Sequence, residues 1–244
     1  MKTKVFGLLI GVLLIGSFIV GCGGGGSKSP TATATPTPTA VATATPTATP
    51  SGLLSDSFTA STLDATIWSN FAGGNSSVTI AADPTNSANN AAKLIGSGNS
   101  MYIWSVAGAA WTDYAYETKV YLDAASSAAF ELCIRSSNST NTCYGVQFFS
   151  GGTAYFFKRV NSARSYLGGT TAANTGLATS SVTGTWKKLK LVASGSSSVT
   201  LQLYVDDVLQ ATSTADTDNP ITSGSVGAVA FNGATLYLDN VSVK

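Results

Sequence analysis

The stretch FELCIRSSNSTNTCYGVQFF, residues 130–149, shows the pattern on which the fold of this chain depends. Two runs rich in aromatic and branched residues flank a short polar segment, which is typical of a β-hairpin. Because side chains alternate between the two faces of a strand, the hairpin separates into two sets. The apolar set, which we expect in a core, is Phe130, Leu132, Ile134, Tyr144, Val146 and Phe148. The polar set, which we expect on an outer face, is Glu131, Cys133, Arg135, Cys143, Gly145 and Gln147.

Short segments of the same kind recur after residue 50. Examples are YAYETKVYLD at 114–123, WKKLKLVA at 186–193 and ATLYLDNVSV at 234–243, each bounded by turn-forming residues. No window shows a competing helical periodicity. Roughly ten to thirteen antiparallel strands over about 190 residues predict an all-β fold, a two-sheet antiparallel β-sandwich of the jelly-roll type.

The first residues of the chain are typical of an export signal. Lys2 and Lys4 precede an apolar run over residues 5–21. Residues 19–22, IVGC, resemble the lipobox of bacterial lipoproteins, in which a peptidase cuts before a cysteine that carries a lipid. The resemblance implies that Cys22 is lipidated and anchors the chain to a membrane. A secreted protein without a lipid, or an anchor formed by an uncleaved helix, is the alternative.

Residues 23–50 consist almost entirely of Gly, Ser, Thr, Ala and Pro. A tract with so little to bury does not order itself, and its Thr-Pro repeats favour extended conformations. The sequence therefore predicts a lipoprotein signal peptide at 1–21, Cys22 with a disordered stalk to residue 50, and one domain at 51–244. Such a stalk would hold the domain outward from a bacterial cell envelope.

The composition excludes several classes of function. The 244 residues include 13 Lys and Arg, 12 Asp and Glu, and no histidine. A nearly neutral chain without basic clusters does not favour nucleic-acid binding. The absence of histidine rules out a Ser-His-Asp triad and removes the commonest metal ligand. We expect a monomer that binds no nucleic acid.

The order of several segments is similar to that in the concanavalin A-like jelly-roll superfamily. These segments include LLSDSFTASTLDATIWSN at 53–70, SGSVGAVAF at 223–231 and LYLDNVSV at 236–243. They most resemble the branch that holds levan-type carbohydrate-binding modules and 3-keto-disaccharide hydrolase-like domains. The resemblance covers nearly all of residues 51–244 and implies that the partner is an extracellular polysaccharide or glycan. It also implies packing roles for Trp68, Trp111 and Trp186.

The same resemblance implies a ligand site lined by a Glu on one strand and an Arg that ends the next. Glu117 and Arg135 match these positions, and Lys119 matches more loosely. On the expectation that the two strands are neighbours, we predict one polar face that binds sugar. Its residues are Glu117, Lys119, Tyr121, Glu131, Arg135 and Gln147, with Tyr155 and Trp104 as further aromatic platforms. A cross-strand ladder of ion pairs is the alternative interpretation.

Two further sites are expected. If Cys22 is acylated, Cys133 and Cys143 remain as an even pair in an exported protein, which predicts a disulfide between them. The resemblance also implies a structural calcium ion where the opening and closing segments meet. Asp56 and Asp239 match its two aspartates, although each could instead cap a turn.

Non-catalytic carbohydrate binding is the predicted function. Glycoside cleavage needs paired carboxylates, and the Glu-x-Asp-x-x-Glu spacing of laminarinase-type sandwiches is missing. An unorthodox pair of Glu117 with Glu131 or Asp113 leaves a hydrolase-like enzyme as one alternative. A surface adhesion or structural protein that binds another protein is the other.

Overall fold

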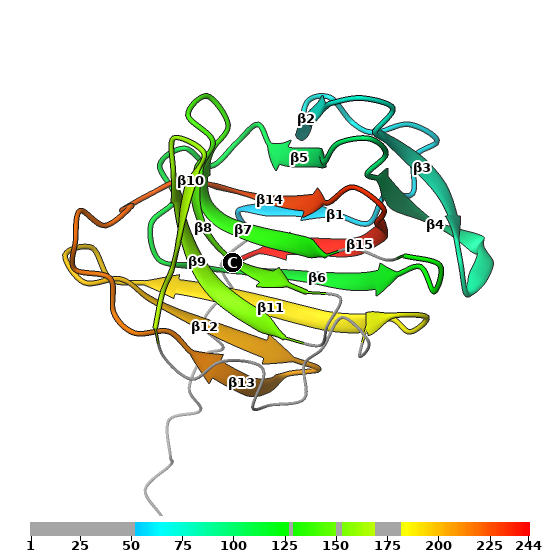
Figure 1. Ribbon diagram of the computed structural model, residues 1–244. Helices are drawn as coiled ribbons and strands as arrows, with labels where there is room; N and C mark the ends of the chain where they lie inside the picture. The colour runs from blue at the N-terminus through cyan, green and yellow to red at the C-terminus, as the bar shows by residue number, and fades with distance from the viewer. Residues whose placement is uncertain (1–51, 127–128, 150–152, 169–181) are drawn as a thin grey trace, which may run out of the picture. The chain divides into compact units, whose positions relative to one another are not determined.

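The computed structural model describes residues 52–126, 129–149, 153–168 and 182–244, which fall in one compact unit, Ala48–Lys244 (Figure 1). The predicted signal peptide, Cys22 and the stalk lie outside the described residues. The strands are Leu54–Asp56 (β1), Trp68–Ala72 (β2), Ser77–Asp83 (β3), Asn86–Ile95 (β4), Met101–Ser105 (β5), Tyr114–Leu122 (β6), Phe130–Ser137 (β7), Thr142–Phe148 (β8), Ala154–Val160 (β9), Ala163–Tyr166 (β10), Lys187–Ser194 (β11), Thr200–Val205 (β12), Val208–Thr212 (β13), Ser225–Ala230 (β14) and Thr235–Val243 (β15). Within these ranges no helix is long and apolar enough to cross a membrane.

The strands form two antiparallel sheets. The eight-stranded sheet has the order β13-β12-β11-β6-β15-β4-β3, and β1 also pairs with β15. The seven-stranded sheet has the order β10-β9-β8-β7-β14-β5-β2. The predicted all-β sandwich is therefore confirmed.

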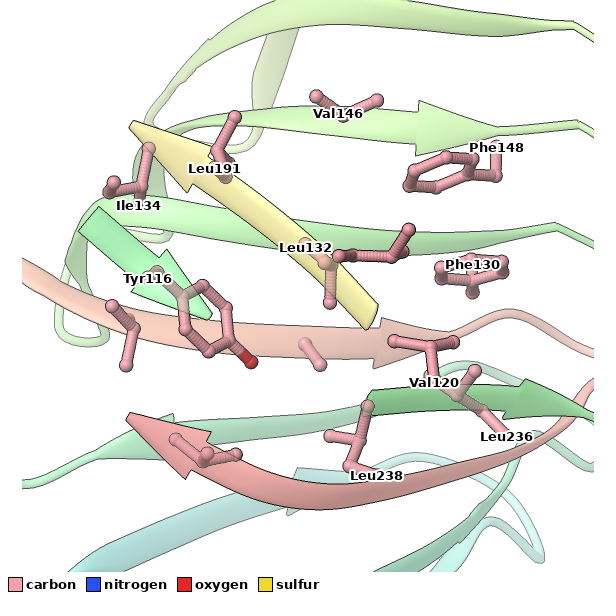
Figure 2. Packing of buried hydrophobic residues seen from close by; sticks show 14 of the residues in the cluster. Tyr116, Val120, Phe130, Leu132, Ile134, Val146, Phe148, Leu191, Leu236 and Leu238 are labelled. Carbon is pink, nitrogen blue, oxygen red and sulfur yellow. The ribbon is translucent and has the colours of Figure 1, made fainter. Parts of the chain in front are cut away.

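The core lies between the two sheets. All six residues of the predicted apolar set on β7 and β8 are buried. Figure 2 shows side chains of this set lying opposite Tyr116, Val120 and Leu191 of the eight-stranded sheet. Phe130 and Phe148 stack with ring centroids 4.4 Å apart, as expected for directly opposed residues of a hairpin. Alternation along each strand places these apolar side chains on the face that points into the core.

The three tryptophans that the sequence assigned to packing have that role. Trp68 is buried in the core, and Trp111 packs against the core. Trp186 is half-buried beside Tyr121, with ring centroids 5.6 Å apart, and its indole N–H donates to Asp83.

Candidate functional site

The predicted sugar-binding face does not exist as one surface. Glu117, Lys119 and Tyr121 lie on β6, which pairs with β11 and β15 in the eight-stranded sheet. Glu131 and Gln147 lie on β7 and β8 in the seven-stranded sheet. The expectation that β6 and β7 are neighbours was wrong, because the chain crosses from one sheet to the other between them. The two groups point away from opposite sides of the core.

The β6 residues take part in cross-strand contacts. Glu117 lies 3.5 Å from the ammonium of Lys188 and 3.9 Å from that of Lys244. Tyr121 contacts Tyr237 edge-on, with ring centroids 5.8 Å apart. The contacts of Glu117 with Lys188 and Lys244 are cross-strand ion pairs, the kind of interaction that the sequence left open as the alternative to a ligand site. Ion pairs at the surface contribute little to stability.

Arg135 is not on an outer face either, and this prediction was also wrong. Its φ is 50° and the β7–β8 register shifts just after Ile134, so a β-bulge interrupts the alternation there. The side chain is fully buried. Its guanidinium donates to the backbone carbonyls of Thr112 and Ile221, each at 2.9 Å, and to the Asp113 carboxylate at 2.8 Å.

The outer face of the seven-stranded sheet carries two aromatic rings that lie over glycines. A Cβ added to Gly227 would meet the Trp104 ring at 2.4 Å, and one added to Gly145 would meet the Phe157 ring at 2.6 Å. Only glycine lets these rings approach the sheet so closely. The two rings pack against Cys133, which pairs with Gly227 on one side and Gly145 on the other.

The two cysteines under these rings are free thiols, contrary to the predicted disulfide. The register places Gly145, not Cys143, directly opposite Cys133. Burial raises the pKa of the Cys133 thiol well above its usual value, and the neighbouring Cys143 thiol adds to the rise. Both side chains are fully buried and act as small apolar groups.

Beside the cysteines, Glu131 is fully buried and forms ion pairs with Arg159 and Arg164. Burial raises the pKa of Glu131, and the two guanidiniums offset part of that rise. Arg164 also donates to the Gln147 side chain at 3.0 Å, and the Tyr166 hydroxyl donates to the same oxygen at 2.8 Å. Glu131 and Gln147, both predicted ligand residues, are thus occupied by protein partners.

A cavity of about 290 Å³, here called the aromatic pocket, opens on this outer face. It is lined by Phe71, Tyr102, Trp104, Asn138, Asn141 and Ser162. Tyr102 stacks on Trp104 with ring centroids 5.9 Å apart, and Phe71 lies 6.1 Å from Tyr102. Trp104 is buried at the base, whereas the Phe71 side chain is 62% exposed. The pocket therefore has an aromatic wall from β2 and β5 and a polar wall from two turns.

Hydrogen bonds fix the side chains of the polar wall. Arg159, fixed by its ion pair with Glu131, donates to the side-chain oxygen of Asn141 at 3.2 Å. The amide nitrogen of Asn141 donates to the Ser162 hydroxyl at 3.1 Å. These two bonds determine which end of the amide is the donor, so Asn141 keeps one N–H for a ligand acceptor.

The predicted calcium aspartates are both engaged with N–H donors. Asp56 accepts from the amide of Phe58 and the indole of Trp68, both at 2.7 Å. Asp239 is buried and accepts from the amide and the side chain of Asn240. In the described part of the chain no three His, Cys, Asp or Glu side chains gather around a possible metal position. Calcium binding stays a prediction.

Comparison with known proteins supports the fold. No protein-family model and no curated protein sequence matches the chain. Among solved structures, the carbohydrate-binding module CBM66 of Bacillus subtilis has a TM-score of 0.55 at 19% identity, over 73% of this chain and 96% of that one. Cellulose induced protein Cip1 has a TM-score of 0.55 at 15% identity, over 78% and 96%. A Bacillus licheniformis β-glucanase has a TM-score of 0.52 at 13% identity, over 80% and 99%. These likenesses support the two-sheet jelly-roll fold that the sequence predicted.

Sequence reasoning named Trp104 in this region but missed Phe71, Tyr102 and the two asparagines. One signal was present, because Tyr102 and Trp104 alternate in the segment MYIWS and so share a face. Nothing local indicated that Phe71 or the turn asparagines would meet them, since β2 and the β7–β8 turn are distant in the sequence.

Proposed function

We propose that the domain binds a carbohydrate chain in the aromatic pocket without cleaving it. The observation that carries the proposal is an aromatic wall, in which Tyr102 stacks on Trp104 and Phe71 is tilted against Tyr102, in a pocket that two asparagines also line. Sugar rings pack their C–H faces on aromatic planes, while their hydroxyls need donors and acceptors at the side. This combination suits a neutral sugar, because none of the lining side chains is charged.

The distribution of carboxylates supports binding over hydrolysis. Glu131 is the only acidic residue in the seven strands of this sheet, and it is buried in two ion pairs. Glycoside cleavage uses two carboxylates roughly 5–10 Å apart that both reach the substrate. The other two carboxylates that the sequence offered for a catalytic pair do not join Glu131. Glu117 lies on the other sheet, and Asp113 pairs with Arg135.

We further propose that the domain is displayed on the bacterial cell envelope by a lipid on Cys22 and the stalk at 22–50. The support is the lipobox-like sequence and the composition of the tract that follows it. The neighbours of the same fold include a carbohydrate-binding module and a β-glucanase, by their names. A domain held outward, as a monomer, would meet polysaccharide outside the cell.

A pull-down with insoluble polysaccharides tests this function. The fragment from residue 48 onward is mixed with cellulose, β-1,3-glucan and levan, with calcium and with a chelator, and released reducing sugar is measured. We expect retention on at least one polymer without release of sugar. Phe71→Ala should weaken retention about tenfold, since an aromatic contact contributes roughly 1–2 kcal/mol.

The matched control is Val208→Ala, because Val208 is also 62% exposed but lies on β13 of the other sheet. It should bind as the wild type does. Release of sugar would indicate a hydrolase, and binding to cells that no polysaccharide competes away would indicate adhesion. Equal retention of Phe71→Ala and the wild type would place the site elsewhere.

A further inference from the structure

A second cavity, of about 610 Å³, adjoins the aromatic pocket at the end of the seven-stranded sheet. Seven serines and Asn138 line it, together with small residues of the β5–β6 connection such as Ala107 and Ala109. We call it the serine cavity. Its size is within the range of roughly 300–1,000 Å³ that ligand pockets occupy. Like the aromatic pocket, it has no charged side chain in its lining.

The two cavities are adjacent, because Asn138 lines both of them. The Asn138 amide reaches from the β7–β8 turn to β2, where it donates to the Ser69 hydroxyl at 3.2 Å. Asn138 thus lies between the lining of the aromatic pocket and Ser69 in the lining of the serine cavity. The bond is exposed to solvent, and such a bond exchanges readily for one to a ligand hydroxyl.

One buried hydroxyl in the lining of the serine cavity lacks a partner in the described part of the chain. Ser136 is buried, and its hydroxyl has no hydrogen-bond partner among the residues that the structure describes. A buried hydroxyl without a partner is unfavourable. Serine hydroxyls both donate and accept hydrogen bonds, so a ligand rich in hydroxyls can pair with this wall, whereas an apolar ligand would leave its accessible hydroxyls unpaired.

We propose that the serine cavity is a second sugar subsite and that the ligand is a neutral oligosaccharide spanning both cavities. One sugar unit packs on the aromatic wall, and the chain continues past Asn138 into the serine cavity. The inference rests on the proposed function, because it extends the same site. It adds a requirement for chain length, which the aromatic pocket alone does not impose.

Titration calorimetry with size-graded oligosaccharides tests the inference. The probes are ladders of one to six sugar units of β-1,4-glucan, β-1,3-glucan and β-2,6-fructan. For a ladder that binds, we expect the affinity to rise about tenfold or more as the chain becomes long enough to enter the serine cavity. Phe71→Ala should weaken binding of every length alike, because it removes the aromatic wall.

Ala109→Leu fills part of the serine cavity from its exposed rim. It should abolish the gain with length and leave the affinity for the shortest binding sugar unchanged. Ala110→Leu is the control, because Ala110 is the next exposed residue but does not line the cavity. Both variants should melt at the temperature of the wild type.

Two results would overturn the inference alone. The first is an affinity that does not depend on the length of the oligosaccharide. The second is an affinity that rises with length in Ala109→Leu as it does in the wild type. Both would leave the proposed function standing, since the aromatic pocket would still bind. Failure of every ladder together with the absence of any polysaccharide retention would overturn the two proposals at once.

Discussion

A buried guanidinium is stable only if acceptors replace the water that its N–H groups lose. Arg135 has acceptors from three parts of the chain, the carbonyls of Thr112 and Ile221 and the carboxylate of Asp113. Tyr114 adds to this arrangement by accepting from the Arg135 amide at 2.7 Å. One residue of the β7 bulge thus ties the start of β6 to the segment before β14.

We expect Arg135→Ala to lower the free energy of unfolding by roughly 3 kcal/mol, because it leaves two carbonyls without donors and opens a cavity. Urea unfolding followed by tryptophan fluorescence measures this change. Arg135→Lys keeps the charge but cannot reach all three acceptors, so it should recover only part of the loss. If Arg135→Ala unfolded with the same midpoint urea concentration as the wild type, the structural role of Arg135 would be contradicted.

At the scale of elements, an internal cation holds the segment between β13 and β14 against the seven-stranded sheet. The ammonium of Lys158 on β9 contacts the carbonyls of Asp218 and Asn219 and lies 2.8 Å from the Asp216 carboxylate. The Tyr144 hydroxyl on β8 donates to the same carboxylate. Burial opposes ionisation of Asp216, but the hydrogen bonds from Lys158 and Tyr144 outweigh it and hold its pKa below the usual value.

This lowered pKa predicts a loss of stability in acid. A carboxyl with a lower pKa in the folded state contributes its full stabilisation above its unfolded pKa of 3.8 and loses it as the pH falls through the folded value. Asp216→Asn should therefore cost most at neutral pH, and its difference from the wild type should shrink below about pH 4. Urea unfolding across this pH range measures the difference.

Asp218→Asn is the control for this measurement, because Asp218 contacts Lys158 through its backbone carbonyl, not its carboxylate. It should follow the wild-type pH dependence. A constant difference between Asp216→Asn and the wild type at every pH would show that ionisation of Asp216 has no part in holding the segment.

At the scale of the whole molecule, the sandwich gives the domain two outer faces of different character. The outer face of the eight-stranded sheet carries ion pairs such as Glu117 with Lys188. The outer face of the seven-stranded sheet carries the aromatic pocket, with the serine cavity at its end. Binding in the proposed site would leave the first face free.

The proposed membrane attachment depends on residues that precede the domain. We expect Cys22→Ala to move the protein from the membrane pellet to the soluble fraction, because lipid chains contribute about 0.8 kcal/mol for each buried methylene. Cell fractionation with immunoblotting measures the distribution. Thr31→Ala, a change within the stalk, should stay in the pellet. Equal pelleting of Cys22→Ala and the wild type would mean that another segment is the anchor.

Local patterns in the sequence were enough to predict the all-β class and the apolar face of the β7–β8 hairpin, whereas the packing roles of Trp68 and Trp111 were implied by the family resemblance. The patterns were enough because alternation along a strand depends only on the residues of that strand. The same reasoning failed at Arg135, where a residue with positive φ interrupts the alternation.

Only the tertiary structure decided which strands are neighbours. The loop after a strand can lead to a neighbouring strand of the same sheet or cross to the other sheet. The sequence pattern of the two strands that it joins is the same in both cases. For this reason Glu117 and Glu131 were expected on one face and lie on two. The aromatic pocket combines β2, β5 and two turns, which are distant in the sequence and meet only through the strand order of the seven-stranded sheet, so strand-by-strand reasoning could not assemble it.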